Sequence, residues 1–521
     1  MKYQTVIIGV GQFVQRYPNA DNLMSSIDLA GEAVSAALND TGKANDIVHS
    51  IDVLAWVREL GASMPAGSTL VSRLKGADNP PAALARKLGR RPASLLHSAM
   101  GGDMPQCLVN EMAAKIGNGE IELALLAGAE AVANAVYCAK NNIDPGWEDK
   151  TDAVVEDRGS GVEKLFHETE AKNGLWEFLP VAYSLFENAW RISHGRDSAQ
   201  HRQAMAELFS IFSDHAKTNP YTMFDQLPDF AALNSNQKLY TSTYTAMHCA
   251  REKVNQGAAL ILCSEEKARQ LGVNQSDWIY VIDGAEVSDK PIIERKNFTE
   301  SASIKALTDY LFTNGEHELD EIDVFNCYSC FPIAVELIMQ HLGLEPNENR
   351  PLTTTGGLPF FGGAGNNYSM HAIASMVELL RIKKRMGSID AKGLVIANGG
   401  VLSKHAMGIY GINAPDKPYT GFNKELLEQA VYQQAQVEWQ SNANGECFLE
   451  VWSLDNRPQA SHSAIVIGRL LSNEKRFVAK VAKDDQRTIA ALVKDMPTKH
   501  GSGYLKGLVS SNSGSNYFSI V

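Results

Sequence analysis

The sequence predicts an α/β protein with a small β-rich domain at its carboxyl end. Strand-like and helix-like segments alternate from the start of the chain, and the same alternation returns from Ile322. After a proline-containing break at Ala414–Pro418, β-prone segments dominate. With 521 residues, 44% of them hydrophobic, the chain is long enough for several domains, each with its own core.

The first half has the order of strands and helices that is typical of βαβ units. Its predicted elements are, in order, the strand Thr5–Val10, the helix Ile27–Leu38, the strands Ile51–Val57 and Ser94–Met100, the helix Pro105–Ile116 and the strand Ile121–Leu126. A glycine turn, Gly101–Gly102, joins the third of these strands to its helix.

The second half repeats this order without repeating the sequence, which indicates an internal duplication. Its predicted elements are the strand Ile322–Phe325, the helices Pro332–Leu342 and Ser369–Lys384, and the strand Gly393–Ala397. We therefore predict two halves, residues 1–270 and 271–414. Residues 135–245, rich in aromatic, asparagine and charged residues and helical at Ala204–Ala216, are predicted to form an inserted lid or binding region.

The two prolines of Ala414–Pro418 remove backbone donors and fix the local conformation, so we expect a domain boundary there. Residues 419–521 are predicted to form a separate domain of ordinary size. Its β-prone runs are Glu446–Leu454, Ala464–Leu470 and Arg476–Val481.

The composition excludes several classes of partner. A net charge of -12 gives no basic surface for nucleic acid and disfavours anionic membranes. The first residues carry too short an apolar run for a signal peptide or a membrane span. Seven scattered cysteines indicate no disulfide framework, so we expect a cytoplasmic protein.

Familiar nucleotide and hydrolase motifs are missing. Gly9-Val10-Gly11 follows the first strand, but Val14 stands where the third glycine of a dinucleotide fingerprint would be, which favours a plain turn. No P-loop, zincin or G-x-S-x-G string occurs.

Cys327 and Cys330 lie between a predicted strand and a helix that begins near Pro332. A thiol at a helix N-terminus gains thiolate character, so this pair could be reactive or redox-active. No second cysteine pair lies at zinc spacing, so we expect no metal site. Two small buried hydrophobic residues at a strand end are an equally good interpretation.

Two further glycine-rich turns, Thr354–Gly365 and Ala397–Val401, lie on either side of one predicted helix. Backbone N–H groups in such turns can approach an acyl oxygen or a phosphate closely and stabilise negative charge. The glycines predicted to bind substrate are Gly101, Gly102, Gly362, Gly363, Gly399 and Gly400. For Gly101–Gly102 alone, a purely structural turn is also a good explanation.

Two histidines near these turns, His371 and His405, are candidates for a general base. His371 shares its predicted helical face with Ser375 and Glu378, so a solvated surface histidine is an alternative interpretation.

Four segments together resemble the thiolase superfamily over about residues 1–412, most closely its sterol-carrier-protein-type and type-1 thiolase-like members. Gly101–Gln106, with Ala127–Glu130 beyond it, is similar to the C-x-S-G-x-Q-A region and the strand end that follows it. The position of the nucleophilic cysteine falls on Gly101. Asn255–Leu262 resembles the strand that closes the first half of the family fold.

The other catalytic positions also differ from the family. Tyr328–Phe331 takes the place of N-E-A-F or H-D-C-F. Gly356–Gly363 matches G-G-x-x-x-x-G-H-P with Gly363 in place of the histidine, and Ala397–Gly400 replaces C-x-G-G with Ala397 in place of the second cysteine.

The resemblance implies a duplicated βαβαβαββ repeat in five layers, α/β/α/β/α, and the strand-rich tail favours the type-1 subgroup. It also implies CoA or an acyl-CoA as the ligand, covered by the inserted region, and an acetyl-CoA acetyltransferase-like place in lipid metabolism. Thiolases of this kind commonly dimerise through the first half, and the added domain leaves a monomer or a homodimer open.

An acyl-enzyme cannot form on glycine, so we expect altered carbon–carbon bond chemistry or acyl transfer through a relocated nucleophile. Tyr328 and His371 are the predicted acid/base groups and Cys330 the predicted thiol, with Asn398 alongside and Gly399 and Gly400 as backbone donors. The alternatives are a non-catalytic acyl-CoA sensor or scaffold, and a thiol-disulfide protein that uses Cys327 and Cys330.

Overall fold

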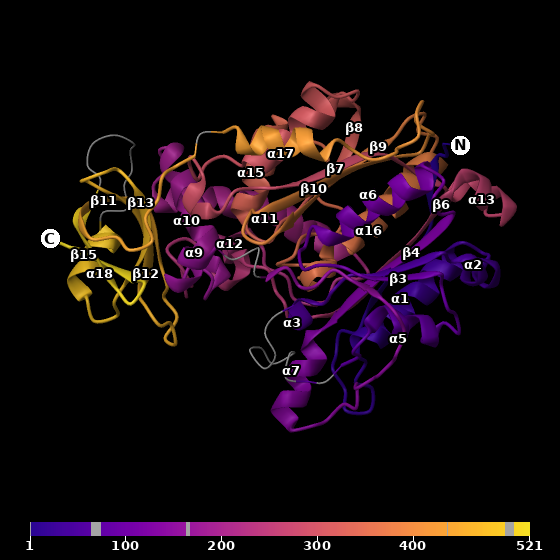
Figure 1. The fold of residues 1–521 in the computed structure, drawn as a ribbon, viewed down its shortest axis with the longest axis horizontal. Coiled ribbons are helices and arrows are strands. Elements are labelled where there is room, and N and C mark those ends of the chain that lie inside the picture. The colour runs from indigo at the N-terminus through magenta and orange to yellow at the C-terminus, as the bar shows by residue number, and fades with distance from the viewer. Residues whose placement is uncertain (1, 64–73, 75, 163–166, 435, 495–504) are drawn as a thin grey trace.

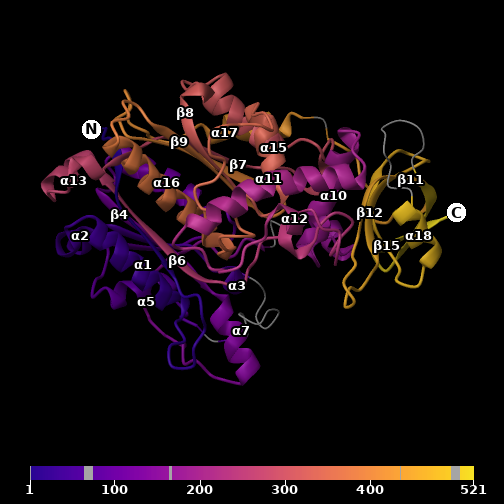
Figure 2. The same cartoon turned by 180° about the vertical axis from the view of Figure 1, so that it is seen from behind.

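The computed structural model describes residues 2–63, 74, 76–162, 167–434, 436–494 and 505–521. Figures 1 and 2 show a large part made of sheet and helices, with a small barrel at one end where the chain terminates. The predicted α/β fold with an additional β-rich domain is therefore confirmed.

A ten-stranded mixed sheet runs through the large part in the order β5-β3-β2-β4-β6-β1-β7-β10-β9-β8. Its strands are β1 (Thr5–Val14), β2 (Val53–Trp56), β3 (Ser94–His97), β4 (Leu123–Ala131), β5 (Glu156–Asp157), β6 (Asn255–Ser264), β7 (Ile279–Ser288), β8 (Ile322–Cys327), β9 (Lys392–Gly399) and β10 (Lys404–Gly411). The first six strands come from the first half of the chain. The pairs Val6–Tyr280 and Ile7–Ile279, between β1 and β7, join them to the other four.

Two helices, α6 (Met104–Gly117) and α16 (Tyr368–Arg385), lie between the two halves of this sheet (Figure 1). Their apolar residues pack with those of the facing strands into one buried cluster. The helices on the outer faces are α1 (Ser26–Asp40), α2 (Ala44–Ser50), α3 (Leu60–Ser63), α5 (Pro80–Lys87), α13 (Glu265–Gln270), α14 (Ala302–Thr308), α15 (Pro332–Leu342) and α17 (Lys424–Tyr432). The outer helices of one half, its part of the sheet, the central helices α6 and α16, the other part of the sheet and its outer helices are the five predicted α/β/α/β/α layers.

The second half differs from the first at its third strand. A short extended segment replaces that strand: the N–H groups of Phe325 and Cys327 in β8 donate to Pro351 and Leu352 at 2.8 and 2.9 Å. The chain then enters the glycine-rich turn directly. This reduced strand still covers the outer edge of β8.

A helical insertion lies between β4 and β6. Its helices are α7 (Val132–Asn141), α9 (Glu168–Lys172), α10 (Leu179–Ser193), α11 (Ser198–Thr218) and α12 (Phe230–Leu233). The helices α10, α11 and α12 lie between the sheet and the terminal barrel (Figure 2). The start of α11 is well defined by the sequence, because Asp197 and Gln200 form a capping box. A role as a lid stays a prediction.

The terminal barrel is closed in the order β11-β12-β13-β15-β14. Its elements are β11 (Gly445–Leu454), β12 (Ala464–Leu470), β13 (Arg476–Val481), α18 (Gln486–Lys494), β14 (Lys506–Asn512) and β15 (Ser515–Ile520). A five-stranded barrel of this kind resembles the OB-fold. The helix α17, which precedes the barrel, packs on α14 and β7 of the large part. The predicted domain limits stay predictions.

Buried Arg476 fixes the barrel to the large part. Its guanidinium pairs with Glu450 in β11 at 2.6 Å and donates to the carbonyl oxygen of Ile293 at 3.1 Å. Within the described ranges, no helix combines the length and the apolar character that crossing a bilayer requires.

The outer edge of β3 is covered by the chain itself. Leu96 and His97 pair with Glu156 and Asp157 of β5, and the N–H of Arg158 donates to the His97 carbonyl oxygen at 3.0 Å. An open edge strand would be free to pair with a second copy. The edge of the sheet is then β5, and an edge strand that is only two residues long and acidic disfavours such pairing.

We therefore expect a monomer, with a mass near 56.8 kDa by light scattering over a wide concentration range. As a control, replacing Arg58 and Arg158 with alanine removes their ion pairs with Asp157 and Glu111 and should loosen β5. Concentration-dependent dimers are then expected only in that variant. A stable dimer of the unmodified chain would contradict the prediction.

Glu130 is a buried carboxyl group in β4 that accepts the Leu60 N–H at 2.6 Å. Burial raises its pKa to about 8, so it carries a proton at neutral pH. In the unfolded chain a glutamate has a pKa of about 4.3. The folded state therefore binds one more proton than the unfolded state between these two values.

Glu130→Gln should remove this dependence. Stability contributed by the protonated group is fully present below the unfolded pKa and is lost as the pH rises through the folded pKa. The unmodified chain should lose about 1.4 kcal/mol per pH unit relative to the variant across that window. Chemical denaturation at several pH values measures this, with exposed Glu120→Gln as the control. Parallel stability curves for Glu130→Gln and the unmodified chain would refute it.

Candidate active site

The turn after β3 and the end of β9 lie against each other. A Cβ on Gly102 would lie 2.6 Å from the Asn398 carbonyl oxygen, and a Cβ on Gly399 would lie 3.3 Å from Gly101 Cα. Gly101 also has a φ of 150°, which side chains disfavour. The approach of these two turns therefore depends on glycine.

The loop after β8 brings two predicted residues to the same place. The Tyr328 hydroxyl occupies the space that a Cβ on Gly102 would need. Cys330 lies 3.7 Å from the Asn398 amide nitrogen, Nδ2, which donates to its sulfur. Tyr328, Cys330, Asn398 and the Gly101–Gly102 turn are thus brought together, from three different strand ends.

Tyr183 of α10 completes this group and was not predicted. Its hydroxyl accepts from Asn398 Nδ2 at 3.0 Å and donates to the Gly400 carbonyl oxygen at 2.8 Å. Its ring stacks on Phe331, with centroids 4.2 Å apart. The only signal in the sequence is that Tyr183 lies in the aromatic-rich insertion, and no motif marks it.

Burial sets the protonation states here. It raises the pKa of Cys330 to about 12 and the pKa of Tyr328 well above its usual range. Both groups are neutral at pH 7. The expected thiolate character at the start of α15 is therefore wrong, because desolvation outweighs the helix terminus. Tyr328 can donate a hydrogen bond, and Cys330 can accept one.

The glycine-rich turn Thr354–Gly365 packs behind the Gly101–Gly102 turn. Asn366, which follows it, accepts the Gly101 N–H at 3.2 Å, and the Gly363 N–H donates to the Arg251 carbonyl oxygen at 2.9 Å. The missing Cβ of Gly362 leaves room for the Gln256 side chain. Two of the N–H groups predicted to bind substrate, those of Gly101 and Gly363, are thus already bonded within the protein.

His371 does not lie at these turns. It is fully buried, and its Nδ1 lies 2.9 Å from the Gln12 side-chain oxygen, while Ser369, two residues earlier, donates to the Gly102 carbonyl oxygen at 2.6 Å. Residues two apart face different sides of a helix. Burial lowers the pKa of His371 to about 3. The surface interpretation is wrong, and its position gives no support to an acid/base role.

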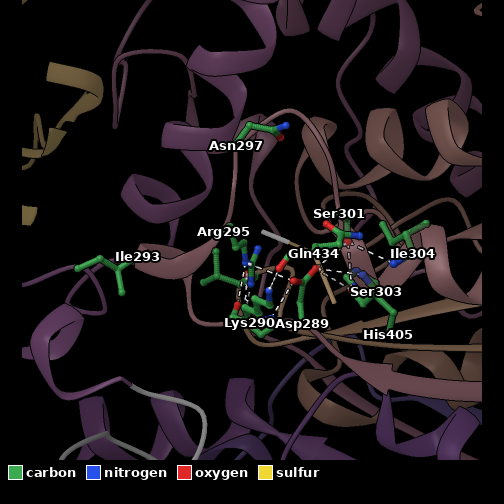
Figure 3. Close-up of polar contacts among 12 residues, drawn as sticks. Asp289, Lys290, Ile293, Arg295, Asn297, Ser301, Ser303, Ile304, His405 and Gln434 are labelled. Atoms are coloured by element: carbon green, nitrogen blue, oxygen red, sulfur yellow. Dashed lines mark hydrogen bonds and ion pairs between the residues drawn. The ribbon is translucent and has the colours of Figure 1, made fainter. Parts of the chain in front are cut away.

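His405 faces an outer helix instead of the turns. Figure 3 shows it beside Ser303, whose Oγ lies 2.7 Å from His405 Nδ1 and 3.0 Å from Asp289. The serine lies between the histidine and the aspartate, so the order is not that of a catalytic triad. Burial lowers the pKa of His405 to about 3.

Two charged residues that were not predicted flank Gly101. Lys404 precedes His405 in β10 and so points to the opposite face of the strand, where its Nζ donates to the Met100 carbonyl oxygen at 2.8 Å. Asp103 is the N-cap residue that precedes α6, and it lies beside Gly101 and Gly399. Asp103 lies within the Gly101–Gln106 motif and Lys404 follows the Ala397–Val401 turn, but no spacing rule singles out either residue.

One cluster, made of buried Glu187 and His201 and partly buried Glu336, has the residue types of a metal site. Its ligand atoms lie within 4.8 Å of one another. Glu187 also accepts from the Tyr244 hydroxyl at 2.6 Å, and the Arg196 guanidinium lies 3.8 Å from Glu336. Burial raises the pKa of Glu187 to about 7, so shared protons and the arginine can balance this cluster without a metal ion.

An open hollow of about 550 Å³ lies away from the turns, between α1, α5 and the segment after α7. Its cationic side chains are paired, Arg86 with Asp149 and Lys87 with Asp28. Among the described residues that line this hollow, no cation is therefore left unpaired for an anionic ligand.

Comparison with known proteins identifies both parts of the chain. Residues 426–504 match the family model of the thiolase-like protein type 1 additional C-terminal domain. The structure is similar to that of a monomeric SCP2-thiolase-like protein type 1 from Mycobacterium smegmatis. The two share 32% sequence identity, with 99% of each chain covered and a TM-score of 0.80.

More distant relatives match in part. The acetyl-CoA acetyltransferase of Methanocaldococcus jannaschii is 25% identical over 238 residues, which are 43% of this chain and 56% of that protein. The chain thus spans about half the length of this relative. The Ltp2-ChsH2(DUF35) aldolase is similar in fold, with 18% identity, a TM-score of 0.56, and coverage of 80% of this chain and 98% of that one. With near-complete coverage by the mycobacterial protein and the matched terminal domain, this chain belongs to the type 1 SCP2-thiolase-like proteins of the thiolase superfamily.

Proposed function

We propose that this protein binds CoA thioesters and catalyses acid–base chemistry that forms or cleaves a carbon–carbon bond without an acyl-enzyme. The observation that carries the proposal is the meeting of the Gly101–Gly102 turn with Asn398 and Gly399 around the Tyr328 hydroxyl. The ends of strands are where α/β proteins bind ligands. The activity belongs to the cytoplasm and to lipid metabolism.

The residues present can support such chemistry. A neutral Tyr328 hydroxyl can donate to a thioester oxygen as charge develops on it. The buried Oδ1 of Asn398 has no hydrogen-bond partner among the described residues, so it is free to accept from a ligand. Backbone N–H groups of Gly399 and Gly400 are the proposed further donors.

Covalent catalysis has less support. Gly101, Gly363 and Ala397 carry no group that could attack a thioester or activate a nucleophile. Cys330 is the thiol at the site, but a pKa of about 12 leaves almost no thiolate at pH 7. An uncharged thiol that accepts a hydrogen bond from Asn398 is better suited to lining the site than to attacking a thioester.

A non-catalytic acyl-CoA sensor is the second candidate. The Asn398 amide nitrogen, the Tyr183 hydroxyl and the Gly400 carbonyl oxygen are already linked by hydrogen bonds, as expected of a site kept for binding alone. A redox role for Cys327 and Cys330 has no comparable support, since both thiols are free and buried.

CoA thioesters should raise the thermal midpoint. A ligand at a hundred times its dissociation constant stabilises the folded state by about 2.7 kcal/mol, which corresponds to a shift of a few degrees. Gly102→Ala should abolish the shift, because its methyl group meets Tyr328 and Asn398. Gly76→Ala, with open space around the added carbon, is the matched control. If neither CoA nor its thioesters shift the unmodified chain, the proposal fails.

No acyl group should become attached to the protein. After incubation with radiolabelled acetyl-CoA and denaturation, the unmodified chain and Cys330→Ala should both retain no label, while Cys330→Ala keeps its thermal shift. A thiolase with its cysteine intact is the positive control. Label that is present in the unmodified chain and absent in Cys330→Ala would instead establish a relocated nucleophile.

A further inference from the structure

We propose that Asp103 is a catalytic base that removes a proton from the α-carbon of a bound acyl-CoA at the Gly101 turn, with Lys404 as the cation beside it. This inference rests on the proposed function, since it requires a thioester in the site. Its experiment separates the failure of binding from the failure of the assigned base.

The first support is the position of the Asp103 carboxyl group. It is buried, and its Oδ1 occupies the space that a Cβ on either Gly101 or Gly399 would need. The acid therefore lies between the two glycine turns, at the position where the thiolase nucleophile would project. An atom attached at Gly101 would be in direct contact with this oxygen.

The second support is that this oxygen is unpaired. Asp103 Oδ1 has no hydrogen-bond partner among the described residues, and the side chain gives no capping bond to α6. The other oxygen, Oδ2, accepts from the Cys107 thiol at 3.6 Å. A buried acceptor without a partner is costly and calls for an explanation. A ligand proton is the missing partner.

The charges around Asp103 suit proton transfer. Burial raises its pKa above the usual range, while the Lys404 ammonium, 3.5 Å from the Cβ position of Gly101, opposes that rise. The other ionisable groups facing it are Cys107, Glu286 and Tyr328. A carboxyl group whose pKa moves toward neutrality is a better base for a weakly acidic carbon.

The step is balanced within the site. A lone pair of Asp103 Oδ1 takes the α-proton, and the carbon–hydrogen electrons move into the thioester carbonyl to form an enolate. The Tyr328 hydroxyl and the Lys404 ammonium stabilise the enolate oxygen. Return of the proton restores the thioester, and in heavy water a deuteron returns in its place. No oxidant or further reactant is needed.

The test follows deuterium incorporation into the α-position of acetyl-CoA in heavy water, by mass spectrometry, together with the thermal shift. The unmodified chain should catalyse incorporation. Asp103→Asn should reduce the rate at least about 100-fold, as expected when a general base is lost, and should keep the thermal shift with acetyl-CoA. Asp103→Ser gives a second uncharged variant if the first is unstable. Glu111→Gln, on the same helix, should exchange at the unmodified rate.

Each outcome decides a different point. Exchange lost in both Asp103 variants with the thermal shift retained supports the inference. Exchange at the unmodified rate in either folded variant overturns it and leaves the proposed function standing. Binding by the unmodified chain without exchange also overturns the inference, and then favours the sensor. Absence of binding refutes the proposed function and this inference with it.

Discussion

The close approach of two backbone turns is the constraint on which the site depends. The turn after β3 and the end of β9 come from opposite halves of the chain. The helices α6 and α16, which lie between the two halves of the sheet, together fix the distance between these turns. At Gly102 a single added carbon would meet the Asn398 carbonyl oxygen at 2.6 Å. The duplication therefore does more than repeat a fold, because each half supplies one wall of a single site.

The sequence predicts the parts of this arrangement that follow from pattern. The alternation of strand-like and helix-like hydrophobic patterns predicts the layers, and the glycine turns mark the strand ends where Tyr328, Cys330 and Asn398 meet. The sequence does not predict residues whose place in the site depends on strand register or on contacts with distant parts of the chain. Lys404 and His405 are neighbours with opposite directions, and without the strand register nothing indicates that the lysine, not the histidine, faces Gly101. Tyr183 comes from an insertion whose docking no local signal determines.

Burial explains the largest difference between expectation and structure. A helix N-terminus favours a thiolate by about 0.3–1 kcal/mol. The rise of the pKa of Cys330 from 9.0 to about 12 corresponds to an opposing free energy of about 4 kcal/mol. Desolvation therefore wins clearly, and the same effect keeps His371 neutral. Sequence spacing shows where a helix begins but not how much water reaches its first turn.

The glycines at positions 101 and 399 are coupled to the packing of Asp103 between them. A side chain at position 101 would meet Asp103 Oδ1, and one at position 399 would meet the same atom. A cysteine at position 101 would therefore need the acid to move, and the unusual φ of 150° adds strain to the substitution. Gly101, Gly399 and Asp103 thus form one packed unit. The side-chain groups that surround these glycine turns are the Asp103 carboxyl, the Tyr328 hydroxyl and the Lys404 ammonium group.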